Sequence, residues 1–288
     1  MRTTITKMTK NLYSQQSKLP RLPVPALEET IEKYLDCSKP FLNNVEYDHN
    51  QKLLNNFKET QGKVLQSRLV ERFNEKENWL IDWWNSQGYL QPRDPVCPFV
   101  NYYFYHRQLL GDNQVNVAAN LLKATLTFKG LVDNEVLDYE SIKGTPLCSS
   151  AYHYLFNSTR LPLKNSDQSV KFDKSNQHVI VISNNRFFRL NADNFDNLEN
   201  QLEQIVKLSS DKKGLPIGVL TTENRDVWSD ARTHIQGISN ENSDNLNDID
   251  SSAIILALDD SAPITREQGS WGAWAGDGRN RWFDKHQS

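Results

Sequence analysis

The stretch HVIVISNNRFFRL, residues 178–190, decides the fold class of this chain. Its first five residues are His178 and a β-branched run, and its last five are mostly aromatic or apolar. Ser183, Asn184 and Asn185 stand between the two runs, and residues of these types favour tight turns. Two strand-like runs joined by such a turn predict a β-hairpin.

Helical and strand-like segments alternate around this hairpin. Apolar residues recur every three or four positions in 115–126 and in 195–205, which predicts a helix in each range. Two short apolar runs, 216–220 and 253–258, predict further strands. Since helices alternate with strands after a helical opening, the fold class is α/β or α+β.

Three local predictions complete this pattern. Residues 148–157 predict a short helix, and Thr222 is expected to cap a helix that runs through Trp228. The Asn- and Asp-rich range 239–250 predicts a solvated loop or the start of a helix.

The N-terminal part of the chain is basic. Residues 1–27 carry five basic residues and no acidic one, with several Ser and Thr among them. This composition is typical of a mitochondrial presequence, although a short disordered tail would have the same composition. We therefore interpret residues 1–18 as a basic tail or a weak presequence.

A helical segment precedes the predicted sheet. Residues 19–25, LPRLPVP, have prolines at alternate positions, which predicts a stiff extended arm. Residues 26–34 predict a short helix, and an apolar stripe runs from Leu53 to Phe73. We expect the proline arm and helical segment to span residues 19–76, and the main domain to span 77–288.

Composition excludes several classes of protein. The 36 acidic and 33 basic residues leave a net charge of −3, so no basic excess favours nucleic acid as a partner. No apolar run reaches the ~18 residues that a membrane helix needs, so no transmembrane segment is expected. The three cysteines are odd in number and form no C-x-x-C, which argues against a disulfide scaffold or a zinc site.

Familiar catalytic motifs do not occur in the sequence. None of the six histidines is followed four positions later by Asp or Glu, and there is no Walker A or G-x-S-x-G motif. His178 opens a strand and is expected to make a local hydrogen bond. Asp259 and Asp260 follow a strand and could bind a metal, but a helix cap or a surface ion pair is favoured. We predict no catalytic residue and no metal ligand.

The segment WLIDWWNSQGYL, residues 79–90, has the highest indole density in the chain. Trp84 and Tyr89 could line a pocket for a quaternary ammonium group, because aromatic faces attract cations. The alternative is that both residues pack in the hydrophobic core, and composition alone favours that alternative.

Several of these segments together resemble the choline/carnitine acyltransferase family. The resemblance rests on residues 19–34 (LPRLPVPALEETIEKY), 79–90 and 144–162 (GTPLCSSAYHYLFNSTRLP). Shorter matching blocks follow in the family's order at 186–188, 219–232, 258–260 and 280–285. The resemblance covers residues 19–288, which is nearly the whole chain.

This resemblance implies an enzyme that transfers an acyl group between coenzyme A and carnitine or choline. It implies two domains, each like chloramphenicol acetyltransferase, of which this chain would hold the first, incomplete and preceded by a helical segment. It assigns Trp84 and Tyr89 to the aromatic positions near carnitine, where they would orient the substrate. Carnitine and acyl-CoA would be the small-molecule partners, with CoA or acetyl-CoA as co-substrate and no tightly bound cofactor.

The chain departs from the family after Lys285. The family's catalytic histidine follows the N-R-W-[YF]-D-K block by more than the three residues present here, and His286 does not match its position. The base, the oxyanion donor and most of the CoA site would belong to the other half. The resemblance thus implies the N-terminal half of an enzyme, inactive by itself.

Alternatives remain open at this point. The lack of membrane helices before the proline arm favours the carnitine acetyltransferase branch over the palmitoyltransferases, and a choline acetyltransferase-type fragment is an alternative. A non-catalytic protein that binds a partner or a carnitine-like ligand through Trp84 and Tyr89 is another. We expect a mitochondrial or peroxisomal location, with the cytoplasm as a further alternative.

Overall fold

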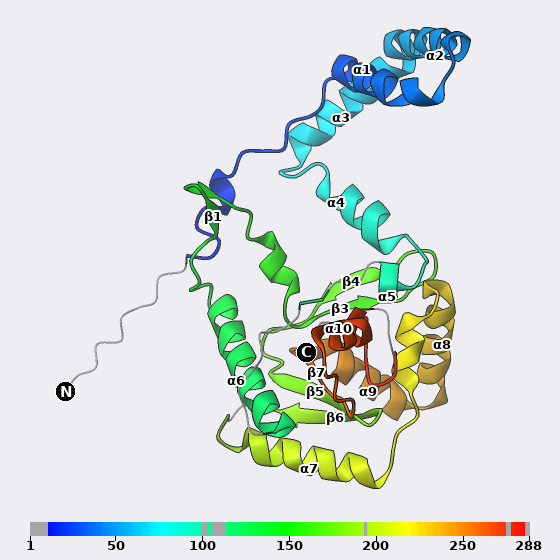
Figure 1. Cartoon of the computed structure of the whole chain (residues 1–288). Helices are drawn as coiled ribbons and strands as arrows, with labels where there is room; N and C mark the ends of the chain where they lie inside the picture. Colours follow the sequence, from blue (N-terminus) through cyan, green and yellow to red (C-terminus); the bar gives the residue numbers. More distant parts are fainter. Residues whose placement is uncertain (1–10, 100–102, 105–112, 193–194, 275–277, 286–288) are drawn as a thin grey trace, which may run out of the picture. The chain divides into compact units, whose positions relative to one another are not determined.

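The computed structural model describes residues 11–99, 103–104, 113–192, 195–274 and 278–285, which divide into two compact units (Figure 1). The helical unit is Pro20–Asn85. The sheet unit consists of the described parts of Met1–Leu19 and Ser86–Ser288. The prediction that residues 77–288 form an acyltransferase domain stays a prediction.

The helical unit contains α1 (Leu27–Ser38), α2 (Asn44–Phe57), α3 (Lys63–Glu75) and the short α4 (Ile81–Trp83). The predicted helix after the proline arm is confirmed by α1. A capping box starts α2, because the Glu46 amide donates to Asn43 Oδ1 (3.0 Å) and the Asn43 amide donates to Glu46 Oε2 (2.9 Å). A π-helical turn, Lys58–Gly62, joins α2 to α3.

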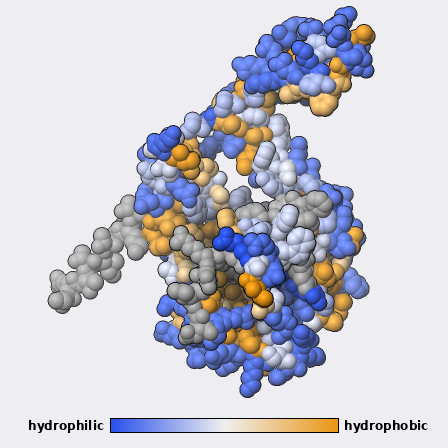
Figure 2. All heavy atoms as spheres, in the orientation of Figure 1, coloured by the Kyte–Doolittle hydropathy of each residue, from blue (hydrophilic) through white to orange (hydrophobic). Residues whose placement is uncertain are grey.

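The proline arm runs along this unit. Trp79 is buried and its Nε1 donates to the Leu22 carbonyl oxygen (3.0 Å), while Gln66 Nε2 donates to the Pro25 carbonyl oxygen (3.0 Å). In contrast, Leu53 and Val64 of the predicted apolar stripe are 55% and 54% exposed. Figure 2 accordingly shows hydrophobic residues on the surface of this unit.

The sheet unit is built around the predicted hairpin, which is confirmed. Strand β5 (His178–Ser183) pairs antiparallel with β6 (Arg186–Asn191) and parallel with β7 (Ile255–Leu258). Asn184 and Asn185 both have positive φ (49° and 62°), the conformation that a two-residue type I′ hairpin turn requires. The sheet order is β6-β5-β7.

The remaining elements of the sheet unit are the two-stranded pairs β1 (Ser141–Ile142) with β2 (Thr145–Pro146) and β3 (Ser158–Leu161) with β4 (Gln168–Lys171), and the helices α5 (Val96–Phe99), α6 (Gln114–Asp133), α7 (Leu198–Asp211), α8 (Arg225–Ile238), α9 (Asn240–Ser251) and α10 (Arg266–Trp274).

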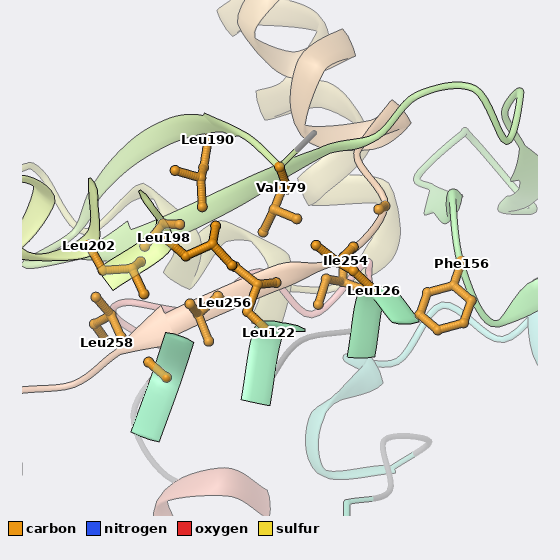
Figure 3. Close-up of a cluster of buried hydrophobic side chains, with 14 of the residues drawn as sticks. Leu122, Leu126, Phe156, Val179, Leu190, Leu198, Leu202, Ile254, Leu256 and Leu258 are labelled. Carbon is orange, nitrogen blue, oxygen red and sulfur yellow. The ribbon is translucent and has the colours of Figure 1, made fainter. Parts of the chain in front are cut away.

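Helices cover both faces of the three-stranded sheet. Side chains alternate along β5. Val179 (Figure 3) and Val181 pack with residues of α6 and α7, whereas Ile180 and Ile182 pack with residues of α8 and α9. Every residue of β5 is buried, as expected for a strand covered on both sides. This layered arrangement agrees with the predicted α/β (α+β) class.

Two local predictions, the strand at 216–220 and the cap at Thr222, are wrong. Residues 216–220 are not a strand: Ile217–Thr222 is a 3-10 helix in which Thr221 Oγ1 donates to the Gly218 carbonyl oxygen (2.6 Å). For 239–250 the helix start is confirmed and the solvated loop is not, because α9 begins at Asn240 and buries Leu246. Asn224, rather than Thr222, caps α8. The helix predicted over 148–157 is a 3-10 helix, Ser150–Tyr154.

Residues 11–18 pack into the sheet unit. Leu12 is 0% exposed, and the amides of Asn11 and Leu12 both donate to the Glu135 carbonyl oxygen (2.7 and 3.1 Å). Gln16 Oε1 accepts from the Ser149 amide (3.0 Å). The prediction of a tail or presequence over 1–18 stays a prediction, and residues 1–10 lie outside the described ranges.

Within the described ranges, no helix is both long enough and apolar enough to cross a membrane.

Candidate functional site

The two aromatic residues singled out in the sequence lie on one π-helical segment, Trp84–Leu90. Trp84 belongs to the helical unit and is 55% exposed, and Tyr89 belongs to the sheet unit and is 44% exposed. The alternative that they pack in a hydrophobic core does not fit these exposures. Their assignment to carnitine stays a prediction.

A buried carboxylate lies close to Tyr89 in the sheet unit. The side chain of Asp167 is fully buried and pairs with three arginines. Its Oδ1 is 3.0 Å from Arg93 Nη2, and its Oδ2 is 2.5 Å from Arg160 Nε and 2.7 Å from Arg225 Nε. A buried charge is tolerated only when it is paired and hydrogen-bonded, and Asp167 meets both conditions.

Arg225 connects this carboxylate to a second one. Its Nη1 lies 2.7 Å from Asp284 Oδ1, and Trp228 Nε1 donates to Asp284 Oδ2 (2.6 Å). Burial raises the pKa of the Asp284 carboxyl above its ordinary value, although Arg225 and the Trp228 hydrogen bond oppose this shift. The blocks 219–232 and 280–285 therefore meet in a buried network of charges.

A third group of charges lies between β3 and α9. Arg232 pairs with Asp250, and Lys285 Nζ donates to the carbonyl oxygens of Ser158 (3.0 Å) and Asp250 (2.9 Å). Burial raises the pKa of Asp250 to about 6 and lowers the pKa of Lys285 to about 7. Both pKa shifts arise from burial in the sheet unit, where α9 and the neighbouring elements enclose the two side chains.

The histidines described by the structure do not form a catalytic arrangement. His178 is buried, its Nε2 is 2.8 Å from the Asp248 carbonyl oxygen, and burial lowers its pKa. The expected hydrogen bond is present, but its partner is 70 positions away in the chain rather than local. His153 is exposed. His286, which does not match the position of the family's catalytic histidine, lies outside the described ranges.

The structure agrees with a surface ion pair at Asp259 and Asp260. Asp259 makes two contacts with Arg281 (2.6 and 2.5 Å), and Asp260 is 3.5 Å from Lys213. Among the residues that the structure describes, no group of three His, Cys, Asp or Glu could hold a metal ion.

Two of the cavities among the described residues lie in the sheet unit. One, of about 230 Å³, lies between the sheet and helices α8 and α9 and is lined mainly by apolar residues such as Ile180, Trp228 and Trp282. The other, of about 890 Å³, lies at the carboxyl ends of β5 and β7 and includes Asp259 and Trp271 in its lining. Neither Trp84 nor Tyr89 lines these two cavities.

Asp167 could not be singled out from the sequence, because it lies outside every block that carries the resemblance. Two of its three partners lie in blocks of the resemblance: Arg160 ends the run FNSTR in 144–162, and Arg225 stands in the run ENRDVW of 219–232. An arginine next to an otherwise buried strand or helix start is a signal that a buried carboxylate is needed. The sequence does not say which carboxylate fills that role.

The sequence of this chain is similar to those of known proteins over nearly its whole length. Residues 22–288 match the profile of a family described as Choline/Carnitine o-acyltransferase. The chain is 35% identical over 295 residues to the mitochondrial carnitine O-acetyltransferase of Saccharomyces cerevisiae, covering 95% of this chain and 44% of that protein. It is 32% identical over 306 residues to carnitine O-acetyltransferase of Mus musculus, covering 97% of this chain and 48% of that protein.

A choline enzyme is also similar to this chain. Human choline O-acetyltransferase is 32% identical over 300 residues, which cover 94% of this chain and 40% of that protein. The chain thus spans somewhat less than half the length of each of these relatives. The matches run through nearly all of its residues, and the predicted resemblance is confirmed: the chain belongs to the choline/carnitine acyltransferase family.

Proposed function

We propose that this chain is the N-terminal part of an enzyme that transfers an acetyl or other short acyl group between coenzyme A and carnitine. The observation that carries this proposal is its similarity to carnitine O-acetyltransferases over 95% and 97% of its length. In the proposed reaction the carnitine hydroxyl oxygen attacks the thioester carbonyl carbon, a base takes the hydroxyl proton, and CoA leaves as the thiol.

The proposed role of this chain is to bind and orient carnitine. Trp84 and Tyr89 would place their aromatic faces against the trimethylammonium group, an attraction worth about 1–2 kcal/mol when the site is desolvated. Their exposure, 55% and 44%, is consistent with ligand contact. We propose no base within these 288 residues, acyl-CoA as co-substrate, and no tightly bound cofactor. A mitochondrial location is proposed from the name of the yeast relative.

The first test concerns activity. The purified 288-residue chain is expected to exchange acetyl groups between acetyl-CoA and carnitine no faster than background, and enzyme-like turnover would refute our placement of the base. The nucleotide sequence after the Ser288 codon provides a second check. A continuation that encodes His-x-x-x-[DE] supports the proposal, whereas its absence favours a stand-alone binding protein.

The second test concerns the two aromatic residues, in the active enzyme that contains this chain. Trp84→Ala and Tyr89→Ala should each raise the KM for carnitine about 5- to 30-fold, the equivalent of one lost cation–π contact. The KM for acyl-CoA should stay the same. Tyr154→Ala is the control, because Tyr154 is 45% exposed in the same unit as Tyr89. An unchanged KM for carnitine in both variants would remove the proposed contact.

Choline is the second candidate acceptor, favoured by the 32% identity to human choline O-acetyltransferase. The same enzyme should therefore be assayed with carnitine and choline at equal concentrations. A higher kcat/KM for choline would replace carnitine in the proposal and leave the acyl-transfer reaction standing.

A further inference from the structure

We propose that Arg160 is a positioning residue for carnitine: held by Asp167, it fixes the main chain at Tyr89. This inference rests on the proposed role of Tyr89 in binding carnitine, and it assigns to Arg160 no contact with the substrate. All residues in the argument belong to the sheet unit.

Arg160 links a carboxylate to a main-chain carbonyl. It lies on β3, its side chain is 17% exposed, and its Nε donates to Asp167 Oδ2 (2.5 Å). Its Nη2 donates to the Tyr89 carbonyl oxygen (2.5 Å). The guanidinium is planar and its donors have a fixed geometry, so one hydrogen bond orients the other.

The carbonyls that end the π-helical segment need such donors. The last carbonyl groups of a helical segment have no partner within it and must be satisfied from elsewhere. Here the Tyr89 carbonyl oxygen accepts a hydrogen bond from Arg160 Nη2. The Leu90 carbonyl oxygen accepts hydrogen bonds from the Asp167 amide (2.8 Å) and from Arg93 Nη1 (3.1 Å). The groups that surround Asp167 thus hold two consecutive carbonyls next to the proposed carnitine contact.

Asp167 itself is fixed by more partners than this one. It also pairs with Arg93 and Arg225, so the loss of Arg160 leaves the carboxylate buried with two arginines. Arg160 is therefore the member of the group whose replacement should disturb the Tyr89 main chain most selectively. Replacing Asp167 would instead leave several buried arginines without their carboxylate and would destabilise the whole unit.

The expected consequence is specific to one substrate. Cation–π attraction requires the cation within about 6 Å of the ring centroid, so a shift of the Tyr89 main chain weakens carnitine binding. Acyl-CoA does not contact Tyr89 in the proposed function, and its KM should be unaffected. A general structural role for Arg160 would instead affect both substrates and the stability together.

The test uses Arg160→Lys and Arg160→Met in the active enzyme that contains this chain. Lysine keeps a positive charge for Asp167, so Arg160→Lys should keep the melting temperature of the parent enzyme. Its single ammonium nitrogen replaces the two separate nitrogens by which Arg160 binds Asp167 and the Tyr89 carbonyl oxygen, so the rigid link between them is lost. Both variants should raise the KM for carnitine about tenfold, the effect of losing a hydrogen bond that involves a charged group, and change the KM for acyl-CoA less than twofold.

The control is Arg186→Lys, since Arg186 also lies on a strand of this unit and donates to a main-chain carbonyl, that of Leu208. It should change neither KM. If Tyr89→Ala raises the KM for carnitine but both Arg160 variants leave it unchanged, the positioning role is refuted and the proposed function stands. Equal changes in both KM values also refute it. If Tyr89→Ala has no effect, the carnitine contact is refuted, and the positioning role with it.

Discussion

Leu12 offers a direct test of whether residues 11–18 are part of the fold. Its side chain is 0% exposed and belongs to the core formed by α6, α7 and the sheet. Truncating a fully buried leucine to alanine removes its transfer free energy and leaves a cavity, which together cost about 3 kcal/mol in well-packed cores. Leu12→Ala should therefore lower the free energy of unfolding of the sheet unit by about that amount.

The measurement is urea unfolding of the 288-residue chain, followed by tryptophan fluorescence. Leu215→Ala is the control, because Leu215 is 80% exposed in the same unit and its loss should cost less than about 0.5 kcal/mol. A deletion of residues 1–18 should lower the midpoint at least as far as Leu12→Ala. An unchanged midpoint in Leu12→Ala would refute the reasoning.

Further predictions concern charge, capping and backbone space. Lys285 has a pKa of about 7 in the folded protein and an ordinary value of 10.5 when unfolded, so between these values the unfolded state binds more protons and stability rises with pH. The free energy of unfolding should increase by about 2 kcal/mol from pH 7 to 9, and Lys285→Met should abolish this increase; an unchanged slope in the variant would contradict it. Asn224→Ala should cost about 1 kcal/mol by removing the cap of α8, and Asn224→Ser should restore most of it, as measured by urea unfolding. Gly218→Ala should destabilise the protein strongly, because a Cβ there would lie 2.0 Å from a main-chain oxygen. Gly130→Ala should stabilise it by about 0.5–1 kcal/mol, because Gly130 lies within α6 and a Cβ there would meet no atom within 4 Å. Thermal melts in which both variants shift the melting temperature in the same direction would contradict this reasoning.

The central part of the fold follows from local sequence rules. The β-branched run of β5 and the turn at Asn184 and Asn185 predict the hairpin, and the periodic apolar residues predict α6 and α7. These signals suffice because burial and backbone preference favour the same structure in each segment.

Other elements depend on contacts that local sequence does not contain. Residues 216–220 resemble a strand, but Ile217–Thr222 form a 3-10 helix in which Gly218 lies directly against the main chain of Arg281. The range 239–250 is polar, and it becomes α9 because Leu246 and Ile249 fill the space beneath the sheet. In both cases the decisive partner is a segment distant in the chain.

The candidate site was predictable only in part. Trp84 and Tyr89 were found through the resemblance, since composition alone favoured core packing for both. Asp167 and its arginines could not be found in this way, because a buried ion pair is defined by three-dimensional proximity rather than by spacing. Arg225 and Asp167, for example, are 58 positions apart.

The late position of Trp282, Asp284 and Lys285 affects how the protein is made. Lys285 binds the carbonyl oxygens of Asp250 and Ser158, which precede it by 35 and 127 positions. At about 5–20 residues per second, a ribosome needs roughly 6–25 s to travel from Ser158 to Lys285. In the later part of that interval, once Trp228 has been made, the nascent chain holds Arg225 without the Asp284 carboxylate and Trp228 without its indole neighbour Trp282. Codon choice and chaperone supply over this stretch should therefore govern the yield of folded protein more strongly than over the preceding helices.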